Sequence, residues 1–259
     1  IIIVKDNTIG EALIGLFRVF KNEFKSDSVI VKTNKNITNN ISSIQKLIDF
    51  NNTDYEFIYD EKLRKLDLVR FDNFTDKSFK LDEQSKDEFI LITGGTGGIG
   101  KMFLKWLTDN RFFNIYVLSR NEYKDNQYVK YIKIDIKSKE SIENNLQDII
   151  SKYKKCKYFF HLAGVLDNTD IKDLNWSKFD NVLEPKINYL DNILKVFDNK
   201  NYQISKTILF SSVYSILGYS KLSHYSCANA YLNGLANIIK NTISICWGTW
   251  DEDGMAFRL

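Results

Sequence analysis

From residue 89 to residue 247, short apolar segments alternate with longer segments in which apolar residues recur every three or four positions. The short segments have the length and β-branched content of buried strands. They span residues 89–92, 115–119, 131–136, 158–163, 207–212 and 243–247. The longer segments predict amphipathic helices after residue 99 and over residues 139–153, 176–197 and 224–239. This alternation is typical of parallel strands joined by crossover helices, so we predict an α/β fold with a doubly wound, Rossmann-type parallel sheet.

The first part of the chain predicts a smaller, truncated Rossmann-like lobe that precedes the larger sheet. Its expected helices cover residues 10–24 and 41–50, and its expected strands cover residues 28–32, 55–59 and 66–71. A charged turn over residues 60–65 separates the last two strands, and the polar segment 72–88 is typical of a linker. Because this part has no glycine-rich phosphate loop, we expect residues 1–85 to be structural and residues 86–259 to form the catalytic subdomain.

The first strand of the larger sheet runs directly into a glycine-rich turn and then into a helix. Residues 93–100 read Thr-Gly-Gly-Thr-Gly-Gly-Ile-Gly and contain the spacing Gly95-x-Gly97-x-x-Gly100. A flexible glycine loop would give the same bare pattern, but the strand before it and the helix after it favour a dinucleotide-binding turn. Glycines allow a close approach to a pyrophosphate, whose charge lies at the helix N-terminus. The candidate phosphate-binding residues are Gly94, Gly95, Thr96, Gly97, Gly98, Ile99 and Gly100.

Other candidates follow the ends of the predicted strands, where doubly wound sheets bind their ligands. Ser119 and Arg120 end the second strand; a cation there, with no acid, favours the 2′-phosphate of NADPH, although a solvated surface arginine is the alternative. The other cofactor candidates are Asp135 and Ile136 at the end of the third strand, and Ala163 and Gly164 at the end of the fourth. The aspartate is placed to meet the adenine or to form a turn, and the small residues would let the cofactor lie close to the backbone.

The last third of the chain carries residues suited to carbonyl reduction. Ser212 ends the fifth strand, and Tyr225 and Asn229 share one helix face by their spacing. Lys186 follows Pro185, the only proline of the chain. A tyrosine hydroxyl can donate a proton if a nearby ammonium lowers its pKa and a serine hydroxyl holds the carbonyl oxygen. Each residue alone has a plainer explanation, as a helix cap, a half-buried aromatic or a surface charge, but their joint placement favours a reductase site.

Composition and charge bear on the classes of partner and on the cellular compartment of the protein. The 259 residues are 44% hydrophobic and 27% charged, which suits a globular protein, and a net charge of +3 with scattered lysines argues against a nucleic-acid partner. Cys156, Cys227 and Cys246 are far apart and odd in number, so we expect free thiols in a reducing, cytoplasmic setting. No apolar run of the sequence reaches membrane-spanning length, and no histidine or cysteine spacing suggests a metal site.

These motifs together make residues 89–256 resemble the catalytic half of a ketoreductase domain from a modular polyketide or fatty-acid synthase, within the short-chain dehydrogenase/reductase superfamily. The matching segments are 93–100, Leu118-Ser-Arg120, His161-Leu-Ala-Gly-Val165, Glu184-Pro-Lys186, Phe210-Ser-Ser-Val213, Tyr225-Ser-Cys-Ala-Asn229, Trp247-Gly-Thr-Trp250 and Gly254-Met-Ala256. Most of the superfamily has its lysine four residues after the tyrosine. Here Asn229 takes that place and the lysine is Lys186, an exchange typical of synthase ketoreductases. Residues 10–71 resemble the truncated structural subdomain that precedes the catalytic half.

The resemblance implies an NADPH-dependent reduction of a β-ketoacyl thioester to the β-hydroxy product. The implied roles are the acid for Tyr225, the donor to the carbonyl oxygen for Ser212, support of the ribose and the proton relay for Lys186 and Asn229, and the nicotinamide border for Trp247 and Gly248. An acyl carrier protein would bring the thioester, and other synthase domains would lie in the same longer chain.

Two departures from the family pattern bear on this interpretation. Family members continue past the Gly-Met-Ala segment into helices and a strand that help close the site, so we expect a truncated piece of a longer protein. Leu166-Asp167-Asn168 stands where one stereochemical class has Leu-Asp-Asp, which favours that class for the product alcohol. A non-catalytic dinucleotide-binding scaffold and a freestanding reductase of small ketones are the alternatives. The presence of all four residues suited to reduction, Lys186, Ser212, Tyr225 and Asn229, disfavours the scaffold. The sequence does not begin with methionine and its first subdomain has no cofactor motif, which disfavours the freestanding reductase.

Overall fold

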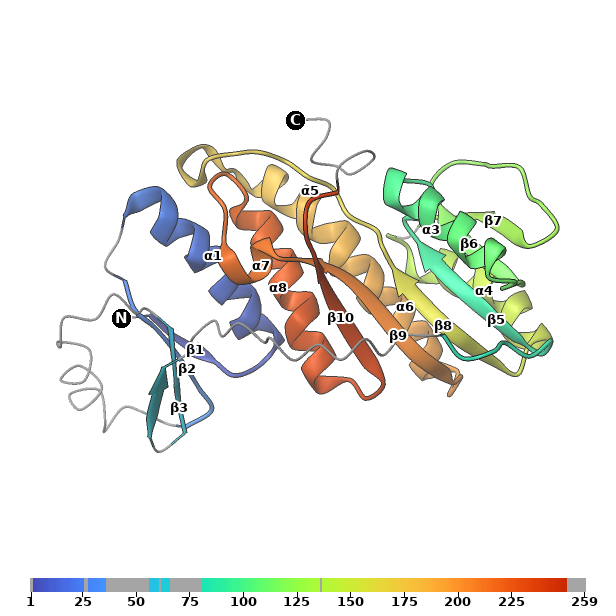
Figure 1. The fold of residues 1–259 in the computed structure, drawn as a ribbon, viewed down its shortest axis with the longest axis horizontal. Helices are drawn as coiled ribbons and strands as arrows, with labels where there is room; N and C mark the ends of the chain where they lie inside the picture. The colour runs from blue at the N-terminus through green and yellow to red at the C-terminus, as the bar shows by residue number, and fades with distance from the viewer. Residues whose placement is uncertain are drawn as a thin grey trace.

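Two sheets organise the protein (Figure 1), and the computed structural model describes residues 2–25, 28–35, 56–60, 62–65, 81–135 and 137–250. The strands of the larger sheet are β5 (Glu88–Thr93), β6 (Ile115–Ser119), β7 (Val129–Lys133), β8 (Lys155–His161), β9 (Ile204–Ser212) and β10 (Thr242–Trp247). The helices of this part are α3 (Gly98–Asp109), α4 (Lys139–Lys152), α5 (Trp176–Lys186), α6 (Asn188–Asn199), α7 (Tyr214–Leu217) and α8 (Ser223–Ile238), with a 3₁₀ turn, η1, over Ile171–Asp173.

The larger sheet is parallel throughout, with the strand order β10-β9-β8-β5-β6-β7. The chain begins at the centre with β5, adds β6 and β7 on one side, and then crosses back to add β8, β9 and β10 on the other. Strand order therefore reverses between β5 and β8, and their carboxyl ends form the crevice where doubly wound sheets bind ligands. The predicted fold class is confirmed.

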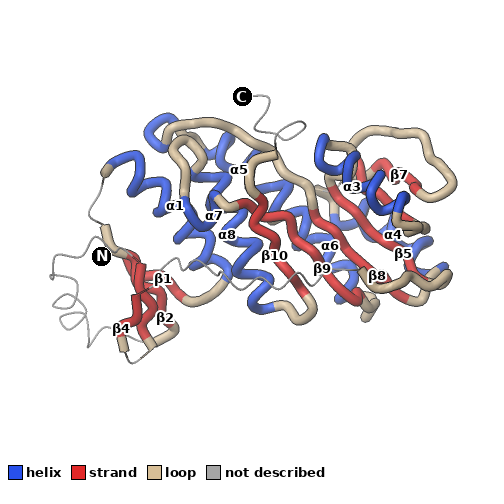
Figure 2. Tube along the Cα trace, in the orientation of Figure 1, coloured by secondary structure: helices blue, strands red, loops and turns tan. Residues whose placement is uncertain are grey.

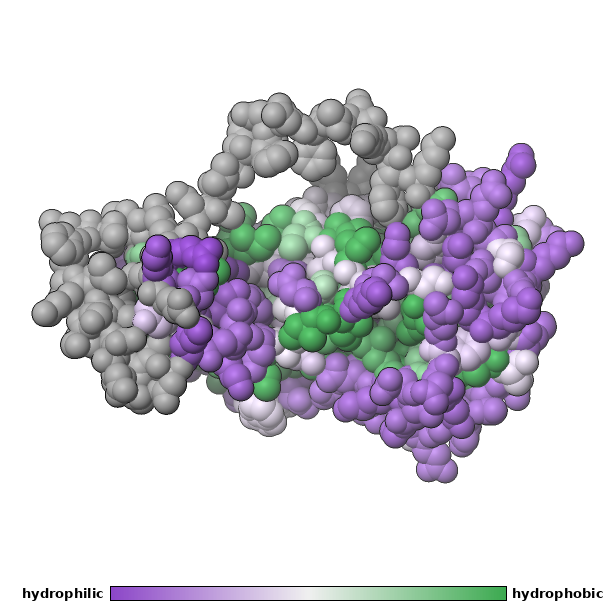
Figure 3. Space-filling model, turned by 90° about the horizontal axis from the view of Figure 1, so that it is seen from below, coloured by the Kyte–Doolittle hydropathy of each residue, from purple (hydrophilic) through white to green (hydrophobic). Residues whose placement is uncertain are grey.

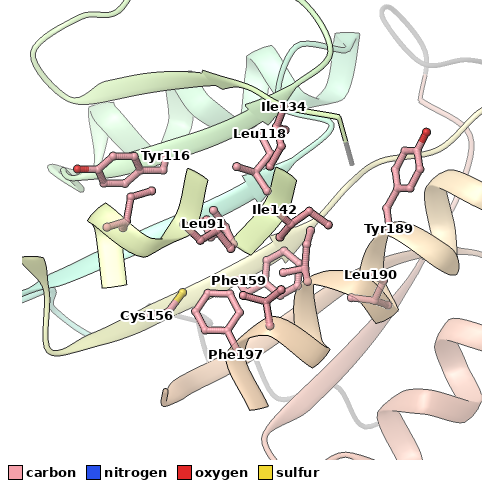
Figure 4. Close-up of a cluster of buried hydrophobic side chains, with 14 of the residues drawn as sticks. Leu91, Tyr116, Leu118, Ile134, Ile142, Cys156, Phe159, Tyr189, Leu190 and Phe197 are labelled. Carbon is pink, nitrogen blue, oxygen red and sulfur yellow. The ribbon is translucent and has the colours of Figure 1, made fainter. Parts of the chain in front are cut away.

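The alternation of side chains along β5 divides the core into two layers. Leu91 points to the face covered by α4, α6 and α8, whereas Ile92 points to the face covered by α3. In the first layer, Phe159 of β8, Ile142 of α4 and Phe197 of α6 belong to the same cluster as Leu91 (Figure 4). Leu91 and Ile92 are both fully buried, because a strand at the centre of the sheet is covered on both faces.

The smaller sheet has the order β1-β2-β3-β4. Strands β1 (Ile2–Lys5), β2 (Ile30–Thr33) and β3 (Glu56–Tyr59) are parallel, and β4 (Leu63–Lys65) is antiparallel to β3. Helix α1 (Thr8–Phe24) connects β1 to β2 and is capped by Asn7, whose Oδ1 accepts a hydrogen bond from the Gly10 N–H at 2.8 Å. Figure 2 shows the two sheets apart, with α1 and α8 between them.

Helix α1 packs along α8 and also touches α7, so α1 joins the smaller lobe to the larger one. A Cβ on Gly15 of α1 would lie 2.5 Å from the carbonyl oxygen of Ser226, and a Cβ on Gly234 of α8 would lie 2.9 Å from Cγ of Glu11. Each glycine lets the partner helix approach closely. With the sheet on one side and α1 on the other, every residue of α8 from Ser223 to Ala230 is buried.

Several boundaries differ from those expected of the larger lobe. Strand β7 starts two residues before the predicted strand and ends at Lys133. The single helix predicted over 176–197 is two helices, α5 and α6, which meet at Ile187. Pro185 lies in the last turn of α5 and removes a backbone donor there, which accounts for the break. Strand β1, helix α7 and the 3₁₀ turn are too short for periodicity to predict.

The smaller lobe and the linker also depart from expectation. Strand β4 occupies Leu63–Lys65, so the turn after β3 is shorter than predicted. The expected helix 41–50 and strand 66–71 lie outside the described residues. The end of the predicted linker is attached to the larger lobe, because Leu81 packs against the core layer under α3 and the Asp82 N–H donates to Tyr158 Oη at 2.8 Å.

Hydrophilic residues dominate much of the described surface. In the view from below (Figure 3) they surround hydrophobic residues that gather near the middle of the face. Among the described residues, the large apolar side chains that are more than half exposed are Ile9, Trp176, Leu217, Tyr219 and Ile238. Single exposed apolar residues are ordinary on folded proteins. None of the described helices combines the length and hydrophobicity that crossing a bilayer requires.

Candidate active site

A cleft of about 410 Å³ opens at the carboxyl ends of the strands in the larger sheet. Its walls come from the segments that follow each strand from β5 to β10, together with α5, the start of α6 and the start of α8. It therefore lies at the reversal of strand order, where the topology places a dinucleotide. The predicted site residues that line it are Gly94, Thr96, Gly97, Gly98, Ile99, Gly100, Ser119, Arg120, Ala163, Gly164, Lys186, Ser212, Tyr225, Trp247 and Gly248.

The glycine turn fits closely against the end of β8. Gly94 has a φ of +73°, and a Cβ there would lie 2.6 Å from the backbone nitrogen of Ala163. A Cβ on Gly100 would lie 2.3 Å from the carbonyl oxygen of Gly94, so the first turn of α3 rests on the glycine turn itself. No described side chain caps α3 at Gly97, and the first residues of the helix line the cleft. These features fit the pyrophosphate of a dinucleotide.

Two of the predicted cofactor residues in the described part of the chain, Gly95 and Asp135, do not line this cleft. Gly95 is buried beneath the turn, where a Cβ would meet Val117 at 2.9 Å, so this glycine allows the turn to pack on β6. Asp135 lies in an adjoining hollow beside Arg120. Its Oδ1 accepts a hydrogen bond from the N–H two residues later at 3.0 Å, so the turn-forming alternative is observed. Ile136 lies outside the described residues.

Arg120 lies where the cleft and the adjoining hollow meet. Its neighbour Ser119 is buried, and the Ser119 Oγ donates to the carbonyl oxygen of Asn121 at 2.6 Å, which fixes the loop after β6. Lys133 shares the hollow and pairs with Glu122 at 3.0 Å. A guanidinium at the position of Arg120 suits a phosphate on the ribose of a dinucleotide.

Lys186 is almost fully buried, at 2% exposure, in the last turn of α5. Its Nζ donates to the carbonyl oxygen of Phe210 at 2.8 Å and lies 5.9 Å from the centre of the Tyr225 ring. Gly164 makes room for it, because a Cβ there would lie 2.9 Å from the lysine Cε. Burial lowers the pKa of Lys186 to about 7. The small residue after β8 therefore admits the lysine and leaves space in the cleft.

Tyr225 occupies the first turn of α8, is 9% exposed and lines the cleft with Ser212. Burial raises the pKa of Tyr225, and hydrogen bonding from the Ser212 and Asn229 side chains acts in the opposite direction. This upward shift is the reverse of the shift expected from the sequence, in which Lys186 lowers the pKa of the tyrosine. Desolvation of the phenol outweighs the stabilisation of tyrosinate by its neighbours, and burial also disfavours the charged form of Lys186.

Asn229 lies one turn further along α8 and outside the lining of the cleft. It is fully buried, and its Nδ2 donates to the backbone carbonyl oxygen of Tyr225 at 2.8 Å. Ser211 Oγ donates to the carbonyl oxygen of Asn229 at 3.0 Å, which ties α8 to β9. The Asn229 Oδ1 has no hydrogen-bond partner among the described residues. A buried amide oxygen of this kind can accept a further hydrogen bond and so suits a supporting role.

His161 links the two strand ends that flank the crevice. Its Nε2 lies 3.2 Å from the carbonyl oxygen of Lys186, and its Nδ1 lies 2.7 Å from Thr93 Oγ1. Since a carbonyl can only accept, Nε2 carries the proton and Nδ1 accepts from the threonine. Burial lowers the pKa of His161 to about 3, so the ring is neutral near pH 7. The histidine stood in a motif of the sequence, but local spacing gave no sign that it joins these three segments.

Some cleft residues were not among the predicted site residues: Lys137, Asn181, Tyr189, Tyr214 and Glu184, of which only the glutamate stood in a quoted motif. Lys137 Nζ and Glu184 Oε2 pair at 2.9 Å and join the loop after β7 to α5. Tyr214 Oη lies 3.3 Å from Thr249 Oγ1 and so joins the segments after β9 and β10. The rule that ligands bind after the strands would have found Lys137 and Tyr214 if it had been applied beyond the motifs.

Comparison with known proteins identifies the relatives of this chain. A family model described as the KR domain matches residues 89–252. A phenolphthiocerol synthesis polyketide synthase type I of Mycobacterium marinum is 26% identical over 186 residues, which are 65% of this chain and 9% of that protein. Polyketide synthase 19 of Gibberella fujikuroi is 30% identical over 155 residues, which are 56% of this chain and 6% of that protein. The chain thus spans less than a tenth of the length of these relatives.

The solved structures agree on the fold. The crystal structure of a ketoreductase domain from the bacillaene assembly line superimposes with a TM-score of 0.76 and 22% identity, over 98% of this chain and 66% of that one. A likeness at this identity establishes the fold alone. The family model goes further, because it covers more than half of the chain and includes the glycine turn, Lys186, Ser212 and Tyr225. The chain belongs to the KR domain family, the ketoreductase domains with the short-chain dehydrogenase/reductase fold.

Proposed function

We propose that this chain is the ketoreductase of a polyketide synthase and reduces the β-keto group of a carrier-protein-bound acyl thioester to a β-hydroxy group with NADPH. The observation that carries the proposal is the convergence of Lys186, Ser212 and Tyr225 in one cleft beside a glycine turn. The curated relatives support the setting, because they are polyketide synthases of which this chain matches a small part. Other synthase domains would therefore lie in the same longer chain.

The three side chains divide the work of carbonyl reduction. A bound nicotinamide dinucleotide supplies the hydride that the carbonyl carbon receives. Ser212 Oγ and Tyr225 Oη both donate hydrogen bonds to the carbonyl oxygen, and Tyr225 transfers its proton to that oxygen to complete the hydroxyl group. The Lys186 ammonium, 5.9 Å from the ring centre, favours the tyrosinate that remains.

The preference for NADPH rests on the end of β6. Arg120 faces both the cleft and the adjoining hollow, and the residue before it is a buried serine rather than an acid. An acid at this point would bind the ribose 2′-hydroxyl of NADH, whereas a guanidinium binds the 2′-phosphate of NADPH in a charge-assisted contact.

Residues 1–85 would act as the structural part of this reductase and residues 86–259 as its catalytic part, in the reducing setting of the cytoplasm. The three cysteines are free thiols, and two of them, Cys156 and Cys227, are buried. Burial raises the pKa of both, for Cys227 to about 12, so both stay protonated and unreactive near pH 7.

Replacement of the proton donor tests the proposal. In the intact protein, Tyr225→Phe should lower turnover of a β-ketoacyl thioester about 10²–10⁴-fold, the loss typical of one general acid. The affinity for NADPH, measured by fluorescence titration, should hardly change, because the phenol ring is retained. Tyr128→Phe, at an exposed position, is the matched control and should keep full turnover.

The alternatives predict other outcomes of the same assay. A parent protein that binds NADPH but reduces no thioester would favour the non-catalytic scaffold. A parent that reduces simple ketones and ignores thioesters on a carrier protein would favour the freestanding reductase. Undiminished turnover in Tyr225→Phe would refute the assignment of the acid.

A further inference from the structure

An acidic residue of the smaller lobe contacts two backbone segments of the larger lobe. Glu23 lies in the last turn of α1, and its Oε2 accepts a hydrogen bond from the N–H of Ile171 at 2.8 Å. Its Oε1 accepts a second hydrogen bond from the N–H of Lys221 at 2.6 Å. These bonds span 148 and 198 residues of the chain. A single carboxylate therefore joins segments that are distant in sequence, through charge-assisted hydrogen bonds.

Both segments lead to residues of the cleft. The segment that contains Ile171 starts after β8 and includes Leu166, which lines the cleft. The segment that contains Lys221 precedes α8, and Tyr225 follows about one helical turn later. The two segments are also bonded to each other, since the N–H of Thr169 donates to the carbonyl oxygen of Lys221 at 3.0 Å.

The backbone at Lys221 needs such contacts. Its φ of +69° lies in the left-handed region, which costs free energy for a residue with a side chain. Glu23 bonds its N–H and Thr169 bonds its carbonyl oxygen, so the surroundings hold both of its peptide groups. Helix α8 begins two residues later at Ser223, and its N-cap residue, Leu222, gives it no side-chain cap. The start of the helix that carries the tyrosine is therefore held by contacts from outside the helix.

A second contact joins the segment after β8 to the residue that precedes the tyrosine. His224 Nε2 lies 3.2 Å from Asp167 Oδ1, and Thr169 Oγ1 donates to the same oxygen at 2.5 Å. His224 directly precedes Tyr225 and is fully buried. The segment after β8 is thus joined to the first turn of α8, and Glu23 bonds both this segment and the residue two positions before that helix.

We propose that Glu23 is a positioning residue for the reductase site: its carboxylate holds the segment after β8 and the start of α8 in the arrangement that directs Tyr225 to the substrate. This inference rests on the function proposed above. The lobe without a glycine turn thereby contributes to turnover as well as to folding. A small displacement of a catalytic group is enough to slow a reaction strongly, even when the altered residue is remote.

The test compares Glu23→Ala and Glu23→Gln with a matched control, Glu11→Gln, in the intact protein. Glu11 lies on the same helix, but its carboxylate bonds Lys32 of the smaller sheet at 2.8 Å and neither of the two segments. We expect Glu23→Ala to lower kcat about 10- to 100-fold, with the Kd and the stoichiometry of NADPH binding unchanged. Glu23→Gln keeps one acceptor oxygen and should lose less, and Glu11→Gln should keep the parent kcat.

Two results would overturn the proposal. One is a kcat of Glu23→Ala equal to that of the parent. The other is a fall in kcat matched by an equal fall in NADPH stoichiometry, because that pattern reports lost folded protein rather than a displaced tyrosine.

Hydrogen exchange tests the same contact without turnover. In Glu23→Ala, amides of residues 169–173 and 219–225 should exchange about tenfold faster or more, and in Glu11→Gln they should exchange at the parent rate. A parent that binds NADPH but reduces no thioester would refute the proposed function. The exchange rates would then decide on Glu23 alone, and unchanged rates in Glu23→Ala would refute its role.

Discussion

At the scale of single residues, the burial of Lys186 in the candidate site lowers the stability of the folded protein. Its ammonium is buried against the neutral carbonyl of Phe210, and no described carboxylate forms an ion pair with it. Burial lowers its pKa from 10.5 to about 7, so between about pH 7 and pH 10.5 the unfolded chain holds a proton that the folded protein has released. Stability from this group is therefore lowest below pH 7 and rises across that window, by an amount on the order of 5 kcal/mol.

Replacement of this lysine should change the dependence of stability on pH. Lys186→Met removes the titrating group and keeps most of the side-chain volume. Relative to the parent, the variant should be most stable below about pH 7, and its advantage should shrink as the pH approaches about 10.5. Urea unfolding of both proteins at several pH values measures this difference, in which the other titrating groups cancel. If the unfolding free energies of the two proteins depended on pH in the same way, the lowered pKa of Lys186 would be refuted.

Arg120 offers a second test at this scale. Arg120→Ala should weaken NADPH binding by about 1.5–3 kcal/mol, the usual range for a hydrogen bond to a charged group. NADH binding should stay the same, because NADH lacks the 2′-phosphate. Fluorescence titration with both cofactors measures the effect, with Lys130→Ala at an exposed β7 position as the control. Equal affinities of the parent for the two cofactors would rule out a specific phosphate contact.

At the scale of elements, the sequence predicts a strand or helix whose pattern lies within one continuous segment. It does not predict a feature that depends on contacts with residues distant in sequence. Strands β5, β6, β8 and β9 were expected because each contains the apolar run of a buried parallel strand. Strand β1 is four residues long and is recognisable only from its pairing with β2. The site follows the same rule. Ser212 and Tyr225 were found from strand ends and helix spacing, whereas the bonds of Glu23 cross 148 and 198 residues and leave no local pattern.

The crossing of α1 and α8 provides a prediction for the elements. In Gly15→Ala the new Cβ would lie 2.5 Å from the Ser226 carbonyl oxygen and 2.7 Å from the Ala230 Cβ, so the helices must separate. This should destabilise the protein by about 1–3 kcal/mol, despite the better helix propensity of alanine. Asn22→Ala, at an exposed position of the same helix, has the propensity gain without the clash and should be neutral or stabilising. Urea unfolding compares the two, and equal stabilities would exclude a tight crossing.

At the scale of the whole molecule, α8 is the element around which both lobes are built. A helix buried on nearly all sides is stable only when neighbours cover each of its faces. The sheet covers one face of α8, and α1, a helix of the smaller lobe, covers another, where Gly15 of α1 meets Ser226 and Ala230. The same helix carries Tyr225 and Asn229, so the structural lobe lies directly behind the candidate catalytic residues.

Removal of residues 1–80 should therefore damage the larger lobe itself. The deletion uncovers the α8 surface around Ser226 and Ala230, which α1 covers so closely that Gly15 has no room for a Cβ. We expect greater binding of an apolar dye, lower solubility and a lower melting temperature than in the intact protein, since exposed apolar patches promote association. NADPH binding should outlast turnover, because the glycine turn lies on β5 and α3 at a distance in the fold from α1, whereas Tyr225 lies on the uncovered helix. Supplying residues 1–80 as a separate chain should restore part of the melting temperature. A deletion variant that is soluble, melts like the parent and reduces a β-ketoacyl thioester at the parent rate would show that the larger lobe is self-sufficient.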